Sequence, residues 1–136
     1  MVLKYEVEGG NFLKAGFASS EVKKILKQLN IDPRIIKRIV VALYEGEVNV
    51  VAHASHGIIL VDIDDKLIYI KIEDKGPGIE NINLALQEGF STASEKVREM
   101  GFGAGMGLPN IKKNTDWFNL KSTVGVGTIL EMKTNF

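Results

Sequence analysis

Apolar positions in the first third of the chain repeat with the period of an α-helix. The segment 19–29 carries one apolar face with this period, and the segment 33–54 carries a second. Between them, Asp32 is suited to cap the second helix and Pro33 to occupy its first turn. The two apolar faces consist of Val22, Ile25, Leu26 and Leu29, and of Ile36, Val40, Leu43, Val50 and Ala54. The pattern therefore predicts two consecutive amphipathic helices.

The other apolar runs are short and rich in β-branched and aromatic residues, which is typical of strands. Four of them form two predicted hairpins, one linked by Asp64-Asp65 and the other by the segment 124–127. The runs are 2–7, 58–63, 66–72, 118–122 and 128–133, with a helical turn expected at 82–87 and a short helix at 108–115. This pattern predicts an α+β fold, a two-layer α/β sandwich in which helices cover one face of a mixed, mostly antiparallel sheet.

Composition limits the class of protein without identifying it. The chain has 136 residues, 17 Lys plus Arg against 17 Asp plus Glu, and no cysteine. The length fits one domain, and the lack of cysteine excludes disulfides and Cys-ligated metals. A net charge of zero gives no reason to expect nucleic acid or an anionic membrane as a partner. No apolar run approaches the roughly 20 residues of a membrane helix, and no signal-peptide core is present, so a cytoplasmic protein is expected.

One face of the predicted helix 33–54 carries polar residues that suit a cation. Glu45, Asn49 and His53 are spaced by four residues, so they lie on one side of the helix. Carboxylate and amide oxygens are ligands that Mg²⁺ prefers, while a solvated polar face is the alternative interpretation. Glu47 points away from this face and either reaches solvent past the edge of the core or is buried and hydrogen-bonded.

A polar loop with two glycines follows the predicted strand 66–72. Asp74 stands at the strand end, and Gly76 and Gly78 follow it. The carboxylate can accept a hydrogen bond from an exocyclic amine, and glycine lets the backbone approach a flat ring closely. An ordinary turn is the alternative interpretation of this segment.

Glycine is abundant, and its distribution is uneven. The chain has 14 glycines, about 10% of its residues, against an average near 7%. Gly101, Gly103, Gly105 and Gly107 alternate before the predicted helix 108–115. Free N–H groups and the helix dipole at such a helix start attract phosphate, and a flexible linker is the alternative. The spacing fits neither a Rossmann fingerprint nor a P-loop.

Taken in order, these motifs resemble those of the GHKL ATPases, the Bergerat-fold superfamily. In detail they resemble the small bacterial anti-sigma-factor serine/threonine kinases and the stress-response switch kinases. The segment 45–53 resembles the N box, 73–79 the first glycine box, 103–108 the second, and 125–128 the terminal Gly-Thr element. The resemblance covers essentially the whole chain. It implies one ATP-binding domain of the Bergerat fold.

The resemblance also implies a role for individual residues. Glu45 would be the general base that acts on an acceptor serine, and Asn49 would bind Mg²⁺. Asp74 would bind the adenine amino group, with Thr128 nearby. The other implied contacts to ATP or ADP are Gly76, Gly78 and Ile79 around adenine, and Gly103, Gly105, Met106, Gly107 and Leu108 at the phosphates. The domain would span 1–136, with 80–102 as a lid over the nucleotide.

The implied function is a protein kinase that regulates a partner, a sigma factor or a STAS-type antagonist, by Mg-ATP-dependent binding and phosphorylation. A homodimer is left open. Two features depart from the family: Glu47 stands where an apolar or small residue is usual, and the predicted lid has no clear catalytic arginine, Arg98 being the candidate. They leave room for a nucleotide-gated binding module without phosphoryl transfer. An ATPase that drives dimer opening is disfavoured, because such proteins carry a transducer domain that is not seen here.

Overall fold

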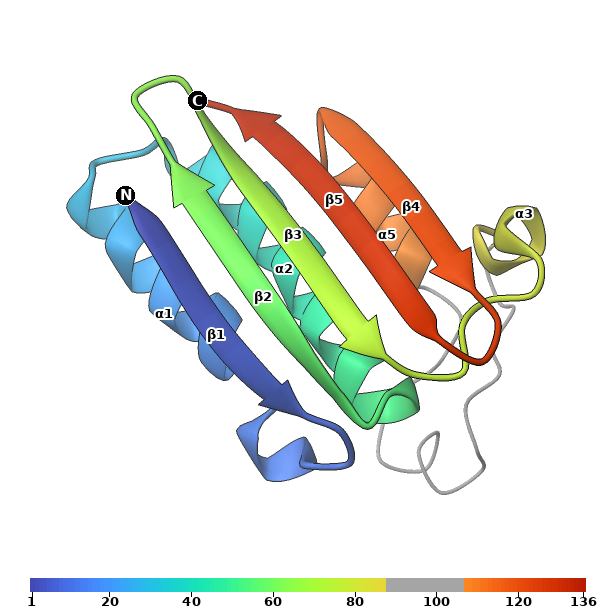
Figure 1. Ribbon diagram of the computed structural model, residues 1–136. Coiled ribbons are helices and arrows are strands. Elements are labelled where there is room, and N and C mark those ends of the chain that lie inside the picture. The colour runs from blue at the N-terminus through green and yellow to red at the C-terminus, as the bar shows by residue number, and fades with distance from the viewer. Residues whose placement is uncertain (88–106) are drawn as a thin grey trace.

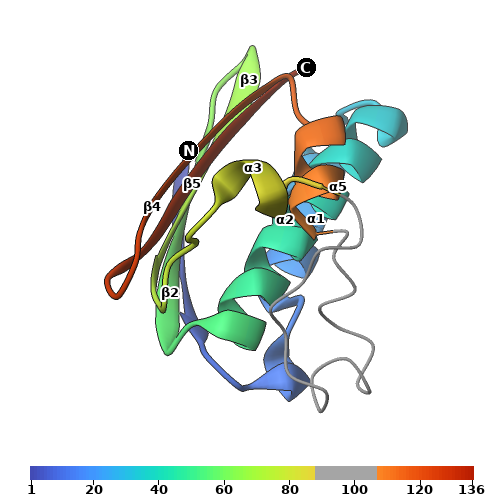
Figure 2. The ribbon, with the colours of Figure 1, turned by 90° about the vertical axis from the view of Figure 1, so that its right-hand side faces the viewer.

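A computed structural model describes residues 1–87 and 107–136, in which five strands form one sheet and the helices lie against one of its faces (Figures 1 and 2). The strands are β1 (Val2–Glu8), β2 (His56–Ile63), β3 (Leu67–Lys75), β4 (Trp117–Thr123) and β5 (Gly127–Asn135). The helical segments are η1 (Phe12–Lys14), α1 (Phe17–Gln28), α2 (Pro33–His53), α3 (Ile82–Ala85) and α5 (Gly107–Lys113). This confirms the predicted two-layer α+β sandwich.

The strand order is β1-β2-β3-β5-β4, and every neighbouring pair in the described sheet is antiparallel. The sheet is thus more regular than the mixed sheet that the sequence suggested. Both predicted hairpins are present, β2–β3 and β4–β5. In the first, the Asp64 side chain accepts hydrogen bonds from the N–H groups of Lys66 at 2.7 Å and Leu67 at 2.8 Å. An aspartate that bonds the backbone two residues ahead is a typical turn former, so the local sequence explains this link.

The two long helices begin for different reasons. Helix α2 starts as predicted, because Asp32 Oδ1 accepts a hydrogen bond from Arg34 N–H at 2.8 Å and Pro33 occupies the first turn. Helix α1 was predicted to start at residue 19, but it starts at Phe17. The prediction that Leu29 belongs to its apolar face is also wrong, since this residue follows the helix and is 44% exposed.

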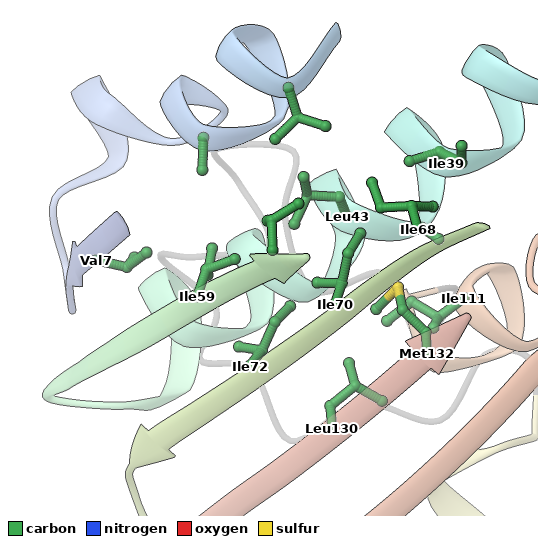
Figure 3. Close-up of a cluster of buried hydrophobic side chains, with 14 of the residues drawn as sticks. Val7, Ile39, Leu43, Ile59, Ile68, Ile70, Ile72, Ile111, Leu130 and Met132 are labelled. Carbon is green, nitrogen blue, oxygen red and sulfur yellow. The ribbon is translucent and has the colours of Figure 1, made fainter. Parts of the chain in front are cut away.

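The core lies between the helices and the sheet (Figure 3). It consists mainly of aliphatic side chains from α1, α2 and the alternating inward positions of β2, β3 and β5. Helix α2 lies especially close to β3. A Cβ atom added to Gly46 would lie 2.4 Å from Cδ1 of Ile72, so the glycine allows this approach. The residues labelled in Figure 3 are Val7, Ile39, Leu43, Ile59, Ile68, Ile70, Ile72, Ile111, Leu130 and Met132.

Glu47 is the acidic residue inside this core, and it is only 2% exposed. One carboxylate oxygen accepts a hydrogen bond from Ala18 N–H at 3.0 Å. The other accepts from Ser19 N–H at 3.2 Å and lies 3.1 Å from the Ser19 hydroxyl. The N-cap residue of α1, Gly16, has no side chain, so Glu47 caps this helix from α2. Of the two alternatives for Glu47, the buried, hydrogen-bonded one is confirmed.

Candidate functional site

At one end of the sheet, β3, β4 and β5 carry polar residues on the face that the helices cover. The inward positions of β3, β5 and β4 hold apolar residues along most of the sheet, and Ile72, Leu130 and Leu120 lie side by side in one row. Side chains alternate along a strand, so the next inward row holds Asp74, Thr128 and Ser122. The end of the core layer is therefore a polar cluster on rigid strands.

The Asp74 carboxylate is the central acceptor of this cluster. Its Oδ1 accepts a hydrogen bond from Thr128 N–H at 3.1 Å. The residue is half-buried, and burial raises the pKa of the Asp74 carboxyl, while the Thr128 N–H opposes this rise. An ionised carboxylate has about four lone-pair positions, so Asp74 retains the capacity to accept from a ligand.

The Ser122 hydroxyl joins the loop after β3 to the start of β5. It accepts a hydrogen bond from Ile79 N–H at 2.7 Å, and it lies 2.8 Å from the Thr128 hydroxyl and 3.2 Å from the Gly127 carbonyl oxygen. A further hydrogen bond, from Gly125 N–H to the Pro77 carbonyl oxygen at 2.9 Å, links the β4–β5 turn to the loop after β3. Ser122 is a site residue that was not predicted. The signal was present, since this serine continues the inward alternation of Phe118 and Leu120.

Glycines let these backbones come into direct contact. Gly78 has φ +75°, and a Cβ atom there would lie 2.4 Å from the carbonyl oxygen of Thr123. A Cβ atom on Gly127 would lie 2.0 Å from the carbonyl oxygen of Asp74. Gly76 packs against the end of α2, where an added Cβ would lie 3.1 Å from the Cα of Ala54. The glycines around Asp74 therefore allow these backbone segments to pack tightly against one another.

A second polar cluster lies where α2 meets the start of α5. Glu45 and Asn49 share one side of α2, as their spacing predicts, and both face Gly107. A Cβ atom on Gly107 would lie 3.3 Å from Asn49 Oδ1 and 3.4 Å from Glu45 Oε2. Asn110 Nδ2 also donates to Glu45 Oε1 at a long 3.4 Å. The oxygen atoms of these two α2 residues are thus directed at the first residue of α5.

Helix α2 connects the two clusters. Ala54, which caps its C-terminus, packs on Gly76 of the first cluster, and it lies about 14 Å from Glu45 along the axis at 1.5 Å per residue. His53 is half-buried at the same end of α2, and burial lowers the pKa of its imidazole.

Not every predicted site residue falls within the described chain. Gly103, Gly105 and Met106 lie outside it, as do Arg98 and most of the predicted lid 80–102. Leu108 is described, and its side chain packs against the core. The helical turn expected at 82–87 is present as α3. Within residues 1–87 and 107–136, no three His, Asp or Glu side chains gather in a group that could hold a metal. No helix in this part of the chain is both long and apolar enough to cross a membrane.

Comparisons with known proteins identify the family of this chain. The profile of the histidine kinase-like ATPase domain matches residues 15–134. The serine/threonine-protein kinase RsbT of Bacillus subtilis is 33% identical over 113 residues, which are 80% of this chain and 79% of RsbT. The anti-sigma F factor of Caldanaerobacter subterraneus is 34% identical over 121 residues, or 85% of this chain and 81% of that protein. A chain in the SiaB–SiaC complex of Pseudomonas aeruginosa superposes with a TM-score of 0.57 over 98% of this chain and 89% of that one, at 11% identity, so it shows the fold alone.

The fold is the two-layer sandwich of GHKL-type domains. The chain belongs to the histidine kinase-like ATPase family, in the group of small anti-sigma-factor kinases.

Proposed function

We propose that this protein is an ATP-dependent serine/threonine kinase that binds a partner protein and phosphorylates it. The carrying observation is the polar row at the end of the sheet, in which the half-buried Asp74 carboxylate is held by Thr128 N–H at 3.1 Å. Family membership and the similarity to a serine/threonine-protein kinase support the same activity.

The row around Asp74 suits the adenine base. A carboxylate held at a strand end accepts a hydrogen bond from an exocyclic amine without having to reorganise. Gly76, Gly78 and Gly127 hold the backbone segments around Asp74 close together, because an added Cβ would meet neighbouring backbone at each of them. In this proposal the flat ring of the base lies beside that backbone. Ile79 N–H is bound to Ser122, so in this proposal Ile79 contributes its side chain and its position, not a hydrogen-bond donor.

The cluster at Gly107 suits the phosphates and Mg²⁺. Amide and carboxylate oxygens are the ligands that Mg²⁺ prefers, and Asn49 would hold the ion. Since no acidic or histidine cluster is found among the described residues, the remaining ligands would be phosphate oxygens and water. Bound there, Mg²⁺ would neutralise charge that develops on the transferred phosphoryl group.

Glu45 is the proposed catalytic base. Its Oε2 lies on the same side of α2 as Asn49, beside the start of α5. In that position it would accept the proton of an acceptor serine hydroxyl, or orient that hydroxyl toward the phosphate. Phosphoryl transfer depends mainly on positioning and charge stabilisation, which fits a site with few chemical groups.

The proposed partner is a sigma factor or a STAS-type antagonist. Relatives named anti-sigma F factor and the kinase RsbT support a regulatory protein partner. In such a protein, the nucleotide state would control the affinity for the partner, and phosphorylation would release or inactivate it.

Nucleotide binding is tested by calorimetric titration of the purified chain with Mg·ADP. We expect saturable binding, and Asp74→Asn should weaken it by about 1–3 kcal/mol, the scale of a lost charged hydrogen bond. Glu73→Gln is the matched control, because Glu73 is the exposed neighbouring acid on the uncovered face of the sheet. The absence of heat from folded wild-type protein would refute the nucleotide site.

Kinase activity is tested separately with labelled ATP, Mg²⁺ and a STAS-domain protein from the same genome. Label should appear on the STAS-domain protein with wild type and be lost with Glu45→Ala, while Mg·ATP binding persists. If nucleotide binds and changes the affinity for the partner, but no candidate partner is labelled, the protein is a nucleotide-gated binding module and not a kinase.

A further inference from the structure

We propose that Ser122 determines the base specificity of the nucleotide site by fixing the direction of the Thr128 hydroxyl proton. It thereby makes the site accept a 6-amino purine and reject a 6-oxo purine. This inference rests on the proposed function, and it adds a residue on β4 that makes no assigned contact with the base.

The numbers of protons and lone pairs at Ser122 indicate which hydroxyl donates in its hydrogen bond with Thr128. A serine hydroxyl has one proton to donate and two lone pairs to accept with. One lone pair receives Ile79 N–H at 2.7 Å. The proton is directed at the Gly127 carbonyl oxygen, 3.2 Å away, which can only accept. The contact with Thr128 Oγ1 at 2.8 Å allows either hydroxyl to donate, and we assign it to the second lone pair of Ser122. This assignment satisfies all three contacts, and in it Thr128 is the donor.

The consequence for the site is a surface of acceptors. With its single proton committed to Ser122, the Thr128 hydroxyl has only lone pairs left for a ligand. Asp74 in its ionised form is also only an acceptor. Two backbone donors beside them are in use as well, because Thr128 N–H binds Asp74 and Ile79 N–H binds Ser122.

Two neighbouring acceptors match an amino group and conflict with a carbonyl oxygen. The exocyclic amine of adenine has two protons, which can serve Asp74 and Thr128 directly or through a bound water molecule. The carbonyl oxygen of a 6-oxo purine would face lone pairs in the same place. A site built to bind a donor discriminates strongly against an analogue that lacks it, because its buried acceptors are then left unpaired.

Removing the Ser122 hydroxyl should relax this discrimination. In Ser122→Ala the Thr128 hydroxyl is free to rotate and can donate to a carbonyl oxygen, and Ile79 N–H is released as a second donor. Affinity for the 6-oxo purine should rise relative to the 6-amino purine, even though the altered residue is one step removed from the base.

The test compares the dissociation constants of Mg·ADP and Mg·IDP, whose bases differ in the 6-amino and 6-oxo groups. The ratio of the two constants is the readout, because a purely structural effect of the substitution would weaken both ligands alike. We expect wild type to prefer ADP, and Ser122→Ala to reduce the preference at least tenfold. Ser122→Thr, which keeps the hydroxyl, should retain it. Thr123→Ala is the matched control, since it removes the exposed neighbouring hydroxyl.

The outcomes separate this inference from the proposed function. If wild-type protein binds neither nucleotide, the proposed nucleotide site is wrong. If wild type binds ADP and the Ser122→Ala ratio stays within twofold of wild type, or if wild type shows no preference, the role of Ser122 is refuted. Should Ser122→Ala not fold, Ser122→Cys is measured against the same criterion, because a thiol is a weak donor and a weak acceptor.

Discussion

Replacing Glu47 with alanine should destabilise the fold strongly, although this residue touches no proposed ligand. Both carboxylate oxygens are engaged at the start of α1, with Ala18 N–H at 3.0 Å and Ser19 N–H at 3.2 Å. Loss of a capping side chain costs about 0.5–2 kcal/mol, and a hydrogen bond to a charged group contributes about 1.5–3 kcal/mol. Glu47 and Ala18 are buried at the base of a groove that Lys14 and Phe17 also line, so removal of the carboxylate would give water access to the released donors. We therefore expect a loss of about 2–4 kcal/mol, below the simple sum of the bonds.

The assay is urea unfolding followed by circular dichroism, with Glu45→Ala as the matched control. Both substitutions remove a glutamate from α2, but within residues 1–87 and 107–136 the hydrogen bond of the Glu45 carboxylate is a long one, 3.4 Å to Asn110. Its loss should cost under about 1 kcal/mol. Glu47→Gln should fall between wild type and alanine, because the amide keeps one acceptor and places an N–H group opposite donors. A Glu47→Ala loss below about 0.5 kcal/mol, or one no larger than that of Glu45→Ala, would refute the capping role.

Three further predictions concern the site and its surroundings. Gly127→Ala should lower both the melting temperature and the affinity for Mg·ADP, because the new Cβ would lie 2.0 Å from the Asp74 carbonyl oxygen. Gly125→Ala is the control: this residue has φ +80° but open space around it, so the substitution should cost only about 1–2 kcal/mol of stability and leave binding intact. Because burial raises the pKa of Asp74, the contribution of this carboxyl group to stability is present below its ordinary pKa and is lost as pH rises through the raised value. At pH 7, Asp74→Asn should therefore be at least as stable as wild type in thermal melting, and a clear loss of stability would contradict this. Because burial lowers the pKa of His53, stability is lost as pH falls below the ordinary value, about 6.5. His53→Gln should weaken the dependence of the melting temperature on pH between pH 7 and pH 5, and an unchanged dependence would count against this role of His53.

Local patterns were enough to predict most of the fold. The alternation in β2 and β3 identified a hairpin, and Asp32 with Pro33 marked the start of α2, because each signal depends on residues close in sequence. The same holds for part of the site. The spacing of Glu45 and Asn49 places both on one side of α2 whatever the rest of the chain does.

The errors arose where a partner lies far away in the sequence. Ser19 resembles an N-cap, so the first helix was predicted to begin there, two residues late. The true cap comes from Glu47, 28 residues further on, which supports a turn that begins after Gly16. Ser122 depends on a distant partner as well, since Ile79 lies 43 residues earlier in the chain. Neither hydrogen bond leaves a local signature, and only the inward alternation along β4 pointed to Ser122.

Helix α2 lies beside the starts of two other helices, α1 and α5, and its side chains make different contacts with each. At α1 the buried Glu47 carboxylate already binds two N–H groups, so this helix start is satisfied by the protein itself and is closed to a ligand. At α5 the residues directed toward Gly107 are Asn49, which is neutral, and Glu45, which has only one weak contact in the described chain. A carboxylate beside phosphate groups repels them unless a cation lies between, so the proposed site needs the Mg²⁺ that Asn49 would hold. Two glutamates separated by one residue thus have different roles: Glu47 caps one helix start, and in the proposed site Glu45 would make nucleotide binding at the other depend on the metal.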